Sequence, residues 1–355
     1  MKKLNVCILF GGISPEHEVS LRSAEFVLNN LDTEKYNVLP VGITKNGEWF
    51  LFGGKDYSLL PQGTWMEHPE NRRAVISPAR GQGLLSFDGE SIVRQQIDVV
   101  FPVLHGENGE DGAMQGLLQM AGIPYVGPHV SASAVAMDKT LTKLVVDQAG
   151  VPQAAWQLVR STELENHMEN TLDALELRFR YPMFVKPAGT GSSVGVSKAK
   201  DRDALQTALA NAAKFDKKIL VEEFIHGREI EVAVMGNDTP VASICGEIDS
   251  GADFYDYDAK YITDTSTAYV PARIPEDVQE IIREAAVKVY SAIGCQGLSR
   301  VDFFATYEEN RVVFNEINTL PGFTSISMYP KLFEASGIPS KELIDQLLKL
   351  AMEAK

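Results

Sequence analysis

The sequence predicts an α/β fold at the N-terminus, followed by a mixed α+β arrangement over the C-terminal two thirds. Three stretches lead to this prediction. An apolar strand, a loop with two glycines and an amphipathic helix open the chain at residues 4–31. Two strands flank a glycine-rich loop at residues 183–198, and residues 300–318 read as a β-hairpin rich in β-branched and aromatic residues. Strand–helix units therefore come first, and antiparallel strands follow.

Composition excludes several classes of protein. A chain of 355 residues with 45% hydrophobic residues is long enough for two or three domains with buried cores. The net charge of −15 argues against a nucleic-acid-binding surface, and no apolar run is long enough to span a membrane. The isolated cysteines Cys7, Cys245 and Cys295 show no metal-binding spacing and no disulfide framework. We expect a soluble cytoplasmic protein without a signal peptide.

Loops that follow buried strands near the N-terminus are candidate ligand sites. Residues 4–10 and 98–104 read as buried strands, and the helix after the first strand spans residues 19–31. Polar, glycine-containing loops follow both strands, at residues 11–18 and 105–112. Ligands of doubly wound domains bind at such loops, although the GxGxxG order of dinucleotide-binding loops is missing.

The middle of the chain contains a lysine inside an apolar strand. A helix is expected at residues 131–148, and the strand at residues 183–187 carries Lys186. A lysine there needs an anionic partner, and the glycine-rich loop that follows favours a phosphate over a protein carboxylate. Residues 191–195 match the GxSxG pattern of serine hydrolases. A strand is expected after this loop instead of the helix that a nucleophile elbow requires, so a hydrolase is disfavoured.

The next strands carry paired glutamates. Glu222 and Glu223 lie in a strand at residues 218–225, whereas Glu229 and Glu231 share one face of a strand, and an exposed sheet face is the simplest structural interpretation of that pattern. Residues 249–269 form a long polar loop rich in tyrosine, which is typical of a lid over a site. Further helices are expected at residues 275–293, 328–336 and 340–353.

The C-terminal hairpin presents one polar face. With its turn centred on Glu309, Asp302 lies opposite Glu316, and Arg300 lies opposite Asn318. The other face is expected to hold apolar side chains: Val301, Phe303, Val313 and Ile317. Two carboxylates and an amide oxygen suit Mg²⁺, which completes its shell with phosphate oxygens and water. A solvated sheet face with cross-strand charge pairs explains the same pattern equally well.

Several motifs, taken in order, resemble one family. They are GGISPEHEVS (11–20), HGENGEDG (105–112), MDK (137–139), FVKPAGTGSSVGVSK (184–198), FYDYDAKY (254–261), GLSRVDFF (297–304) and NEINTLPGFTSISMYP (315–330). The chain resembles D-alanine–D-alanine ligases of the ATP-grasp superfamily from its first strand to its last helix.

The resemblance implies a fold and a reaction. It implies a Rossmann-like N-terminal domain at residues 1–128, a central domain at 129–222 and a C-terminal domain at 223–355, with ATP clamped between the antiparallel sheets of the last two. The lid would be the loop 249–269, and the metal would bind the hairpin 300–318. ATP-dependent joining of two D-alanines, through an acyl phosphate, would supply a peptidoglycan precursor. Such relatives are commonly homodimers.

The resemblance also assigns roles residue by residue. Metal ligands would be Asp302, Glu316 and Asn318, holding two Mg²⁺ ions that Mn²⁺ can replace. ATP-binding residues would be Lys139, Lys186, Gly191, Ser193, Glu222, Glu223, Ile225, Glu229 and Lys260. Catalytic residues would be Glu16, Ser192, Tyr261, Arg300, Gly322 and Ser327. Substrate-binding residues would be His105 and Met328.

These roles describe one reaction. Glu16 would take the ammonium of the first D-alanine and connect through Ser192 to Tyr261, while His105 would lie at that substrate's carboxylate. Arg300 and the Gly322 N–H would stabilise the oxyanion, an interaction worth about 3–4 kcal/mol per donor. Ser327 and the Met328 backbone would hold the carboxylate of the second substrate.

Other functions stay open at this point. Tyr261 and Met328 favour D-alanine as the second substrate over D-lactate and D-serine, but the resemblance extends to ligases of the D-serine type. A different ATP-grasp ligase and an ATP-binding relative without turnover are further alternatives. Retention of Arg300, Asn318 and Lys260 argues against the last of these.

Overall fold

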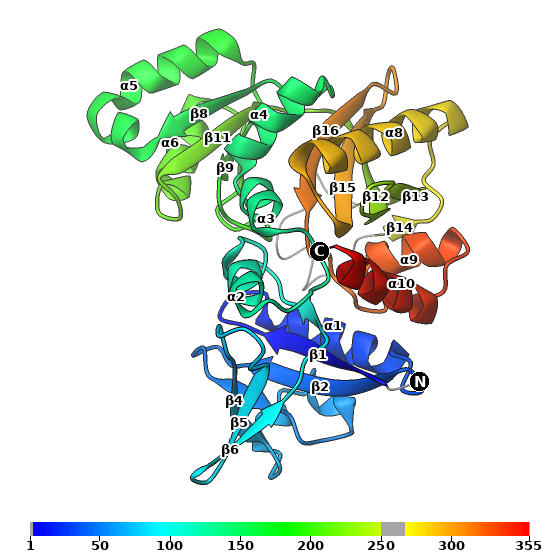
Figure 1. The fold of residues 1–355 in the computed structure, drawn as a ribbon. Helices are drawn as coiled ribbons and strands as arrows, with labels where there is room; N and C mark the ends of the chain where they lie inside the picture. The colour runs from blue at the N-terminus through cyan, green and yellow to red at the C-terminus, as the bar shows by residue number, and fades with distance from the viewer. Residues whose placement is uncertain (1–2, 250–266, 355) are drawn as a thin grey trace.

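The computed structural model describes residues 3–249 and 267–354, which contain three β-sheets (Figure 1). The first sheet, in blue and cyan, lies at the bottom of Figure 1, and the second and third lie above it in green and in yellow to orange. The first is partly parallel, and the other two are wholly antiparallel. The predicted fold class is therefore confirmed. No described helix is long and apolar enough to cross a membrane.

The first sheet is built on the apolar strand that opens the chain. Its strands are β1 (Leu4–Gly11), β2 (Tyr36–Ile43), β3 (Trp49–Leu51), β4 (Arg72–Ile76), β5 (Leu84–Asp88), β6 (Ser91–Gln95) and β7 (Val99–Val103), with the 3₁₀ helices η1 (Tyr57–Leu59) and η2 (Trp65–Glu67) between β3 and β4. β1 pairs in parallel with β2 and β7, and residues 6–10 are fully buried, as a strand covered on both faces requires. The strand order is β6-β5-β4-β3-β2-β1-β7.

Helices from both ends of the chain cover this sheet. α1 (His17–Asn30) buries Leu21, Ala24 and Leu28 at the spacing of one helical face, and α10 (Ser340–Glu353) buries a similar row. α9 (Met328–Ala335) precedes α10, and both share one hydrophobic core with β1 and α1. The C-terminal helices therefore join the first sheet to the third, whereas α2 (Ala113–Ala121) belongs to a separate core on the other side.

The second sheet has the strand order β10-β9-β11-β8. Its strands are β8 (Trp156–Arg160), β9 (Met183–Pro187), β10 (Ser197–Ala199) and β11 (Lys218–Glu223). α5 (Ser161–Arg178) and α6 (Arg202–Ala212) pack on one face of it and bury their apolar side chains in a single core. β9, the loop after it and β10 form the predicted hairpin.

The third sheet has the strand order β14-β13-β12-β15-β16. Its strands are β12 (Gly227–Gly236), β13 (Val241–Asp249), β14 (Thr267–Tyr269), β15 (Gly297–Thr306) and β16 (Val312–Asn318). α8 (Glu276–Ile293) covers one face and buries Ile282, Ala286 and Val289 against the sheet. The opposite face carries the polar residues of the hairpin.

One predicted helix is two helices. The periodicity over residues 131–148 predicts a continuous helix, but the chain breaks at Asp138 between α3 (Val130–Met137) and α4 (Lys139–Ala149). Asp138 has the extended angles φ −87° and ψ 101°, and its carboxylate accepts hydrogen bonds from the N–H groups of Thr140 and Leu141. It thereby caps α4, because an aspartate at this position satisfies donors that have no partner within the helix.

Candidate active site

A cavity of about 1580 Å³ lies between the three sheets. Every predicted site residue that the structure describes lines it, including those of the N-terminal loops, of both antiparallel sheets and of the loop after β16. Lys260 and Tyr261 lie outside the described residues, as does most of the predicted lid. The cavity therefore collects residues that are more than 300 positions apart along the chain, from Glu16 to Lys331.

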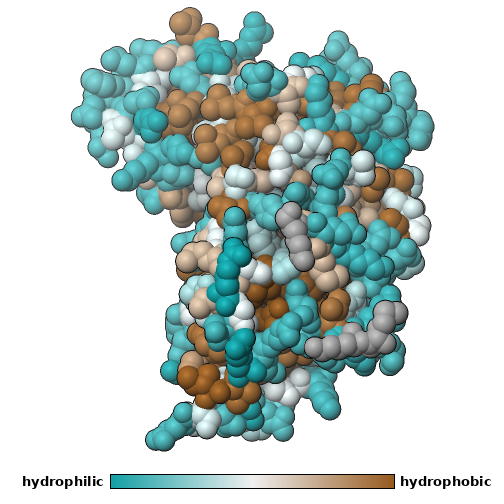
Figure 2. Space-filling view, in the orientation of Figure 1, coloured by the Kyte–Doolittle hydropathy of each residue, from teal (hydrophilic) through white to brown (hydrophobic). Residues whose placement is uncertain are grey.

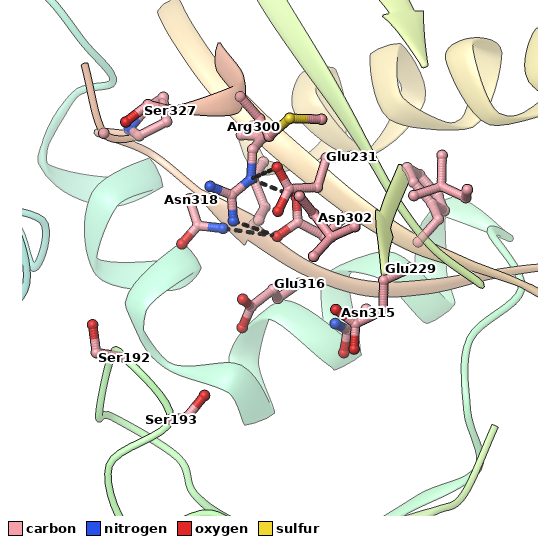
Figure 3. Close-up of a pocket in the computed structure, with 18 of the residues that line it drawn as sticks. Ser192, Ser193, Glu229, Glu231, Arg300, Asp302, Asn315, Glu316, Asn318 and Ser327 are labelled. Atoms are coloured by element: carbon pink, nitrogen blue, oxygen red, sulfur yellow. Dashed lines mark hydrogen bonds and ion pairs between the residues drawn. The ribbon is translucent and has the colours of Figure 1, made fainter. Parts of the chain in front are cut away.

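The hairpin of β15 and β16 forms one wall of the cavity. Arg300 pairs with Asn318 and Asp302 pairs with Glu316, so the predicted register is confirmed at these positions. Nε and Nη2 of Arg300 donate to the two oxygens of Asp302 at 2.8 and 2.7 Å, and Nδ2 of Asn318 donates to Oδ2 of the same carboxylate at 3.1 Å (Figure 3). Asp302 is only 6% exposed. The solvated charge-pair interpretation of this face is thus excluded for Asp302.

Glu231, for which the sequence suggested only an exposed sheet face, also belongs to this wall. It lies opposite Asp302 on β12, and its Oε2 is 3.2 Å from Nε of Arg300. Its side chain is 13% exposed, so the expected exposed sheet face is wrong for Glu231. Burial opposes the charge on Arg300, but Asp302 and Glu231 outweigh it and raise the pKa of Arg300 above its ordinary value.

A β-bulge changes the hairpin beyond Asp302. Phe303 pairs with Phe314, so Asn315 is the extra residue and the register shifts by one. Val313 consequently leaves the core that holds Val301, Phe303 and Ile317 and packs with Ala154 and Ile225 instead. The prediction that Val313 shares their face is wrong, because one inserted residue exchanges the two faces of a strand.

The second sheet forms the opposite wall, where a buried glutamate joins two lysines. Lys186 Nζ is 2.7 Å from Oε2 of Glu222, and Lys143 Nζ makes an ion pair with Oε1. Burial would raise the pKa of Glu222, but the charges of Lys143 and Lys186 outweigh it and lower the pKa to about 2. The protein group that pairs with Lys186 is therefore a carboxylate, whereas the sequence had favoured a phosphate as its partner.

The glycine-rich loop after β9 reaches across to the N-terminal domain. Ser192 Oγ donates to Oε1 of Glu16, and Lys139 Nζ donates to the carbonyl oxygen of Thr190 at 2.6 Å. Ser192 and Ser193 have positive φ angles of 47° and 57°, a sharp local turn. β10 follows the loop, so the geometry of a nucleophile elbow is absent here. Figure 3 shows both serines across the open space from the hairpin.

Apolar side chains line the part of the cavity beside Lys186. Ile225, Ala154 and Val313 form a buried cluster, and the rings of Phe184 and Phe224 stack with their centroids 5.9 Å apart. Oε1 of Glu223 accepts a hydrogen bond from the Ala155 N–H at 2.8 Å. A flat aromatic base matches such a pocket in shape and polarity.

The N-terminal loops and the segment after β16 close the cavity. His105 is 6% exposed, with Nδ1 3.0 Å from the carbonyl oxygen of Leu320. Burial lowers the pKa of His105. A Cβ on Gly322 would lie 2.9 Å from Oγ of Ser327, so only glycine fits there without displacing the serine. Met328 is 5% exposed, and its terminal methyl group packs toward Gly246.

Sequence reasoning missed Lys143, Glu231 and Glu110 as residues of the cavity. Glu110 accepts hydrogen bonds from the N–H groups of Gly106 and Leu320 at 2.7 and 3.2 Å. Burial, followed by the charge of Glu16, raises the pKa of Glu110 to about 8. Its place in the motif HGENGEDG was the available signal, whereas nothing local marks Lys143.

The oxygen atoms of the hairpin fit a magnesium ion that takes its remaining ligands from phosphate and water. Among the described residues, no three His, Cys, Asp or Glu side chains converge as a metal site would require. Asp302, Glu316 and Asn318 provide two carboxylates and an amide on neighbouring strands. Hard oxygen donors in so small a number suit Mg²⁺ that is shared with phosphate oxygens, and Mn²⁺ accepts the same donors.

Comparison with known proteins identifies the family. The family models "D-ala D-ala ligase N-terminus" and "D-ala D-ala ligase C-terminus" match residues 5–128 and 145–349. The D-alanine–D-alanine ligase of Acetivibrio thermocellus is 49% identical and that of Caldicellulosiruptor bescii 48%, each over 99% of this chain and 96% of its own length.

Solved structures agree with this result. The VanG D-Ala:D-Ser ligase from Enterococcus faecalis has a TM-score of 0.89 and 38% identity, over 99% of this chain and 100% of its own. The D-alanine–D-alanine ligase from Coxiella burnetii has a TM-score of 0.86 and 36% identity, over 99% of this chain and 95% of its own. This chain therefore belongs to the D-alanine–D-alanine ligase family and has the ATP-grasp fold of these enzymes.

Proposed function

We propose that this protein uses ATP to join two D-alanine molecules into D-alanyl-D-alanine, the dipeptide of peptidoglycan precursors. One observation carries the proposal: a wall of carboxylates on β15 and β16 faces buried lysines of β9 and α4 across a single cavity. A nucleotide triphosphate with its metal ions has the charge pattern that fits between these walls, since phosphates need cations on every side.

The chemistry proceeds in two steps. The carboxylate of the first D-alanine attacks the γ-phosphorus of ATP, which releases ADP and leaves an acyl phosphate. The amine of the second D-alanine then attacks the acyl carbon, and inorganic phosphate leaves as the peptide bond forms. The protein's part is to position both substrates and to stabilise the charge that develops on oxygen.

The nucleotide and its metal ions are held by residues of the two walls. Lys139 and Lys186 bind the phosphates, the loop with Gly191 and Ser193 covers them, and Lys260 contacts the γ-phosphate. Asp302, Glu316 and Asn318 would hold the two Mg²⁺ ions, which neutralise phosphate charge when bound. Glu222, Glu223, Ile225 and Glu229 bind the adenosine. The stacked Phe184 and Phe224 rings support this location for the base.

The amino acids bind at the side of the cavity next to the N-terminal domain. Glu16 takes the ammonium of the first D-alanine, and its hydrogen bond with Ser192 supports a chain of contacts that continues to Tyr261. His105 lies near the carboxylate of that substrate. Arg300 and the Gly322 N–H stabilise the oxyanion. Ser327 and the backbone of Met328 hold the carboxylate of the second D-alanine.

D-serine is the second candidate for the second substrate. The observation in its favour is the similarity to VanG, a D-Ala:D-Ser ligase by name. The apolar Met328 beside the cavity favours the methyl group of D-alanine over a hydroxymethyl group. Apolar pockets separate such close analogues by only about 1–3 kcal/mol, so the experiment must measure both.

A phosphate-release assay tests the proposal. Purified protein, ATP and Mg²⁺ would be mixed with D-alanine alone, with D-alanine and D-serine, and with D-alanine and D-lactate, and the products identified by mass spectrometry. We expect fast phosphate release and D-alanyl-D-alanine from D-alanine alone. No release with D-alanine alone would refute the main proposal, and a mixed product formed faster than the homodipeptide would favour the D-serine alternative.

Finer proposals concern organisation and location. We propose domain limits at residues 128 and 222, a cytoplasmic location and a homodimer formed through the N-terminal domain. Val75, Phe87 and Ile92 share the face of β4, β5 and β6 opposite the core, and they are 41, 39 and 63% exposed. Figure 2 shows apolar surface at the lower end of the molecule, where these strands lie. An apolar face on this domain supports a contact between copies.

A further inference from the structure

The segment after β16 is held on both sides of Gly322 by residues of the N-terminal domain. Leu320 lies two residues before Gly322, and Phe323 follows it directly. The backbone of Leu320 contacts His105 and Glu110, and the N–H of Phe323 donates to Ser23 Oγ at 3.2 Å. All of these contacts join residues more than 200 positions apart in the sequence.

The hydrogen bonds determine where the protons lie. A carbonyl oxygen only accepts, so Nδ1 of His105 must carry the proton that it shares with Leu320. Nε2 of the neutral ring is then an acceptor, and it lies 3.4 Å from Oγ of Ser23. That hydroxyl accepts from Phe323 and can donate to Nε2. One continuous chain of hydrogen bonds therefore runs from Leu320 through His105 and Ser23 to Phe323.

Ser23, His105 and Glu110 together form a clamp on the segment after β16. Within this clamp, Glu110 binds the N–H of Leu320, whereas His105 binds its carbonyl oxygen. Oε1 of Glu110 accepts from the Leu320 N–H at 3.2 Å, and its Oε2 accepts from the Gly106 N–H at 2.7 Å. Both the N–H and the carbonyl oxygen of Leu320 are thus fixed by the loop at residues 105–112. Within the described part of the chain, no hydrogen bond of the Gly322 N–H is seen, and Gly322 lines the cavity.

We propose that Ser23, His105 and Glu110 are positioning residues that hold the backbone on both sides of Gly322, so that its N–H keeps the orientation that ligation requires. Their role rests on the proposed function, in which this N–H stabilises the oxyanion. A donor that is held in place before the reaction avoids the reorganisation that would otherwise slow it. Besides its proposed place near the carboxylate of the first substrate, His105 then acts on the loop through Nδ1.

Two substitutions at His105 separate these roles. The side-chain amide of H105N can place a donor near the position of Nδ1, whereas that of H105Q reaches the position of Nε2. We expect H105N to retain clearly more turnover than H105Q, because it keeps the bond to Leu320. The reverse order would overturn the proposal, since Nε2 would then be the atom that matters.

Ser23→Ala and Glu110→Gln test the clamp itself. S23A removes the acceptor of the Phe323 N–H, and the single carbonyl oxygen of E110Q cannot serve both backbone donors. We expect kcat to fall by about 10- to 100-fold, as small displacements of catalytic groups do, while KM for ATP changes by less than about threefold. Amide hydrogen exchange of a peptide covering residues 319–327 should accelerate in both variants.

Matched controls exclude general loosening of the fold. Ser133 is a fully buried serine that donates to Pro128, and Asp345 is a largely buried carboxylate that bonds to Tyr36. Neither lines the cavity. S133A and D345N should therefore leave both turnover and exchange at residues 319–327 close to those of the unmodified protein.

The two measurements distinguish the clamp from the function on which it rests. Unchanged exchange in S23A and E110Q would overturn the clamp, even if D-alanine ligation is confirmed. Faster exchange with unchanged kcat would also overturn the proposal, because it would show that the orientation of the Gly322 N–H does not limit ligation. Faster exchange together with a lower kcat, at an unchanged KM for ATP, is the expected result.

Discussion

The two antiparallel sheets form opposite walls of one cavity, and their charges differ in sign. The second sheet and α4 contribute Lys186 and Lys143, with Glu222 between them. The third sheet contributes the carboxylates of Glu231, Asp302 and Glu316, with Arg300 among them. Phosphates can contact the first wall directly, but they need metal cations to approach the second. We therefore propose that the first wall binds phosphate and the second binds metal.

Asp302→Asn breaks the carboxylate wall and should have the largest effect. It removes a charge but preserves shape, and it deprives Arg300 of its closest anionic partner. We expect turnover to fall by about 1,000-fold or more, as is typical when a metal ligand that stabilises phosphoryl transfer is lost. Phosphate release measures it, and circular dichroism checks the fold. Turnover within about tenfold of the unmodified protein would refute the metal assignment.

Lys186→Met breaks the lysine wall and should have the second largest effect. The ammonium group of Lys186 provides the positive charge of β9 in the cavity. Burial lowers the pKa of this group, but the charge of Glu222 outweighs burial, and the pKa is raised. We expect kcat/KM for ATP to fall by about 100-fold, equivalent to about 3 kcal/mol of lost transition-state stabilisation. Lys341→Met is the control, because that lysine is 62% exposed and outside the cavity. A similar loss in K341M would show that net charge alone is responsible.

Lys143→Met tests the more deeply buried of the two lysines that pair with Glu222. Its side chain is 3% exposed and pairs with Glu222. We expect the free energy of unfolding to fall by about 3 kcal/mol, since the substitution leaves a buried carboxylate with one partner fewer. KM for ATP should rise by about tenfold. In the double variant K143M/E222Q, the stability should partly recover, and additive losses would contradict a direct coupling between the two groups.

Asp345→Asn tests a carboxylate outside both walls and should have the smallest effect. Burial would raise the pKa of Asp345, but hydrogen bonds with Lys349, Tyr36 and Lys35 outweigh it and lower the pKa from 3.8 to about 2. A lowered pKa stabilises the fold above about pH 4, and the contribution disappears as the pH falls through about 2. We expect D345N to lose about 1–2 kcal/mol at pH 7, measured by urea unfolding.

The same pH series contains its own check. On acidification from about pH 5 toward pH 2.5, the difference in stability between D345N and the unmodified protein should shrink, because the carboxyl of the unfolded chain, with its ordinary pKa of 3.8, takes up a proton before the native carboxyl does. A constant difference over this range would mean that Asp345 contributes through packing alone, without its charge.

Local pattern was enough to predict much of the hairpin. Alternation at period two, about a polar turn, predicts the pairing of Asp302 with Glu316, and the structure confirms it. The bulge at Asn315 has no such signal, because Val312, Val313 and Phe314 before it are all apolar and do not alternate with polar residues. Val313 was assigned to the wrong face for that reason.

Contacts between distant segments could not be predicted from local pattern. The hydrogen bonds that His105 donates to Leu320 and that Phe323 donates to Ser23 depend on how two domains meet. Glu231 was expected in solvent, because alternation shows which residues share a face but not what covers that face. The family motifs brought the site residues together, and their individual roles stay predictions.

The position of α10 has a consequence for synthesis of the chain. β1 and α1 lie within the first 30 residues, yet the core that they form also contains Leu343, Leu347 and Leu348. While the ribosome is still translating, α1 can cover only part of this apolar face, and the part that α9 and α10 bury stays exposed. We therefore expect the first 128 residues alone to be prone to aggregation, and a ribosome that stalls before residue 340 to release a chain that chaperones must bind.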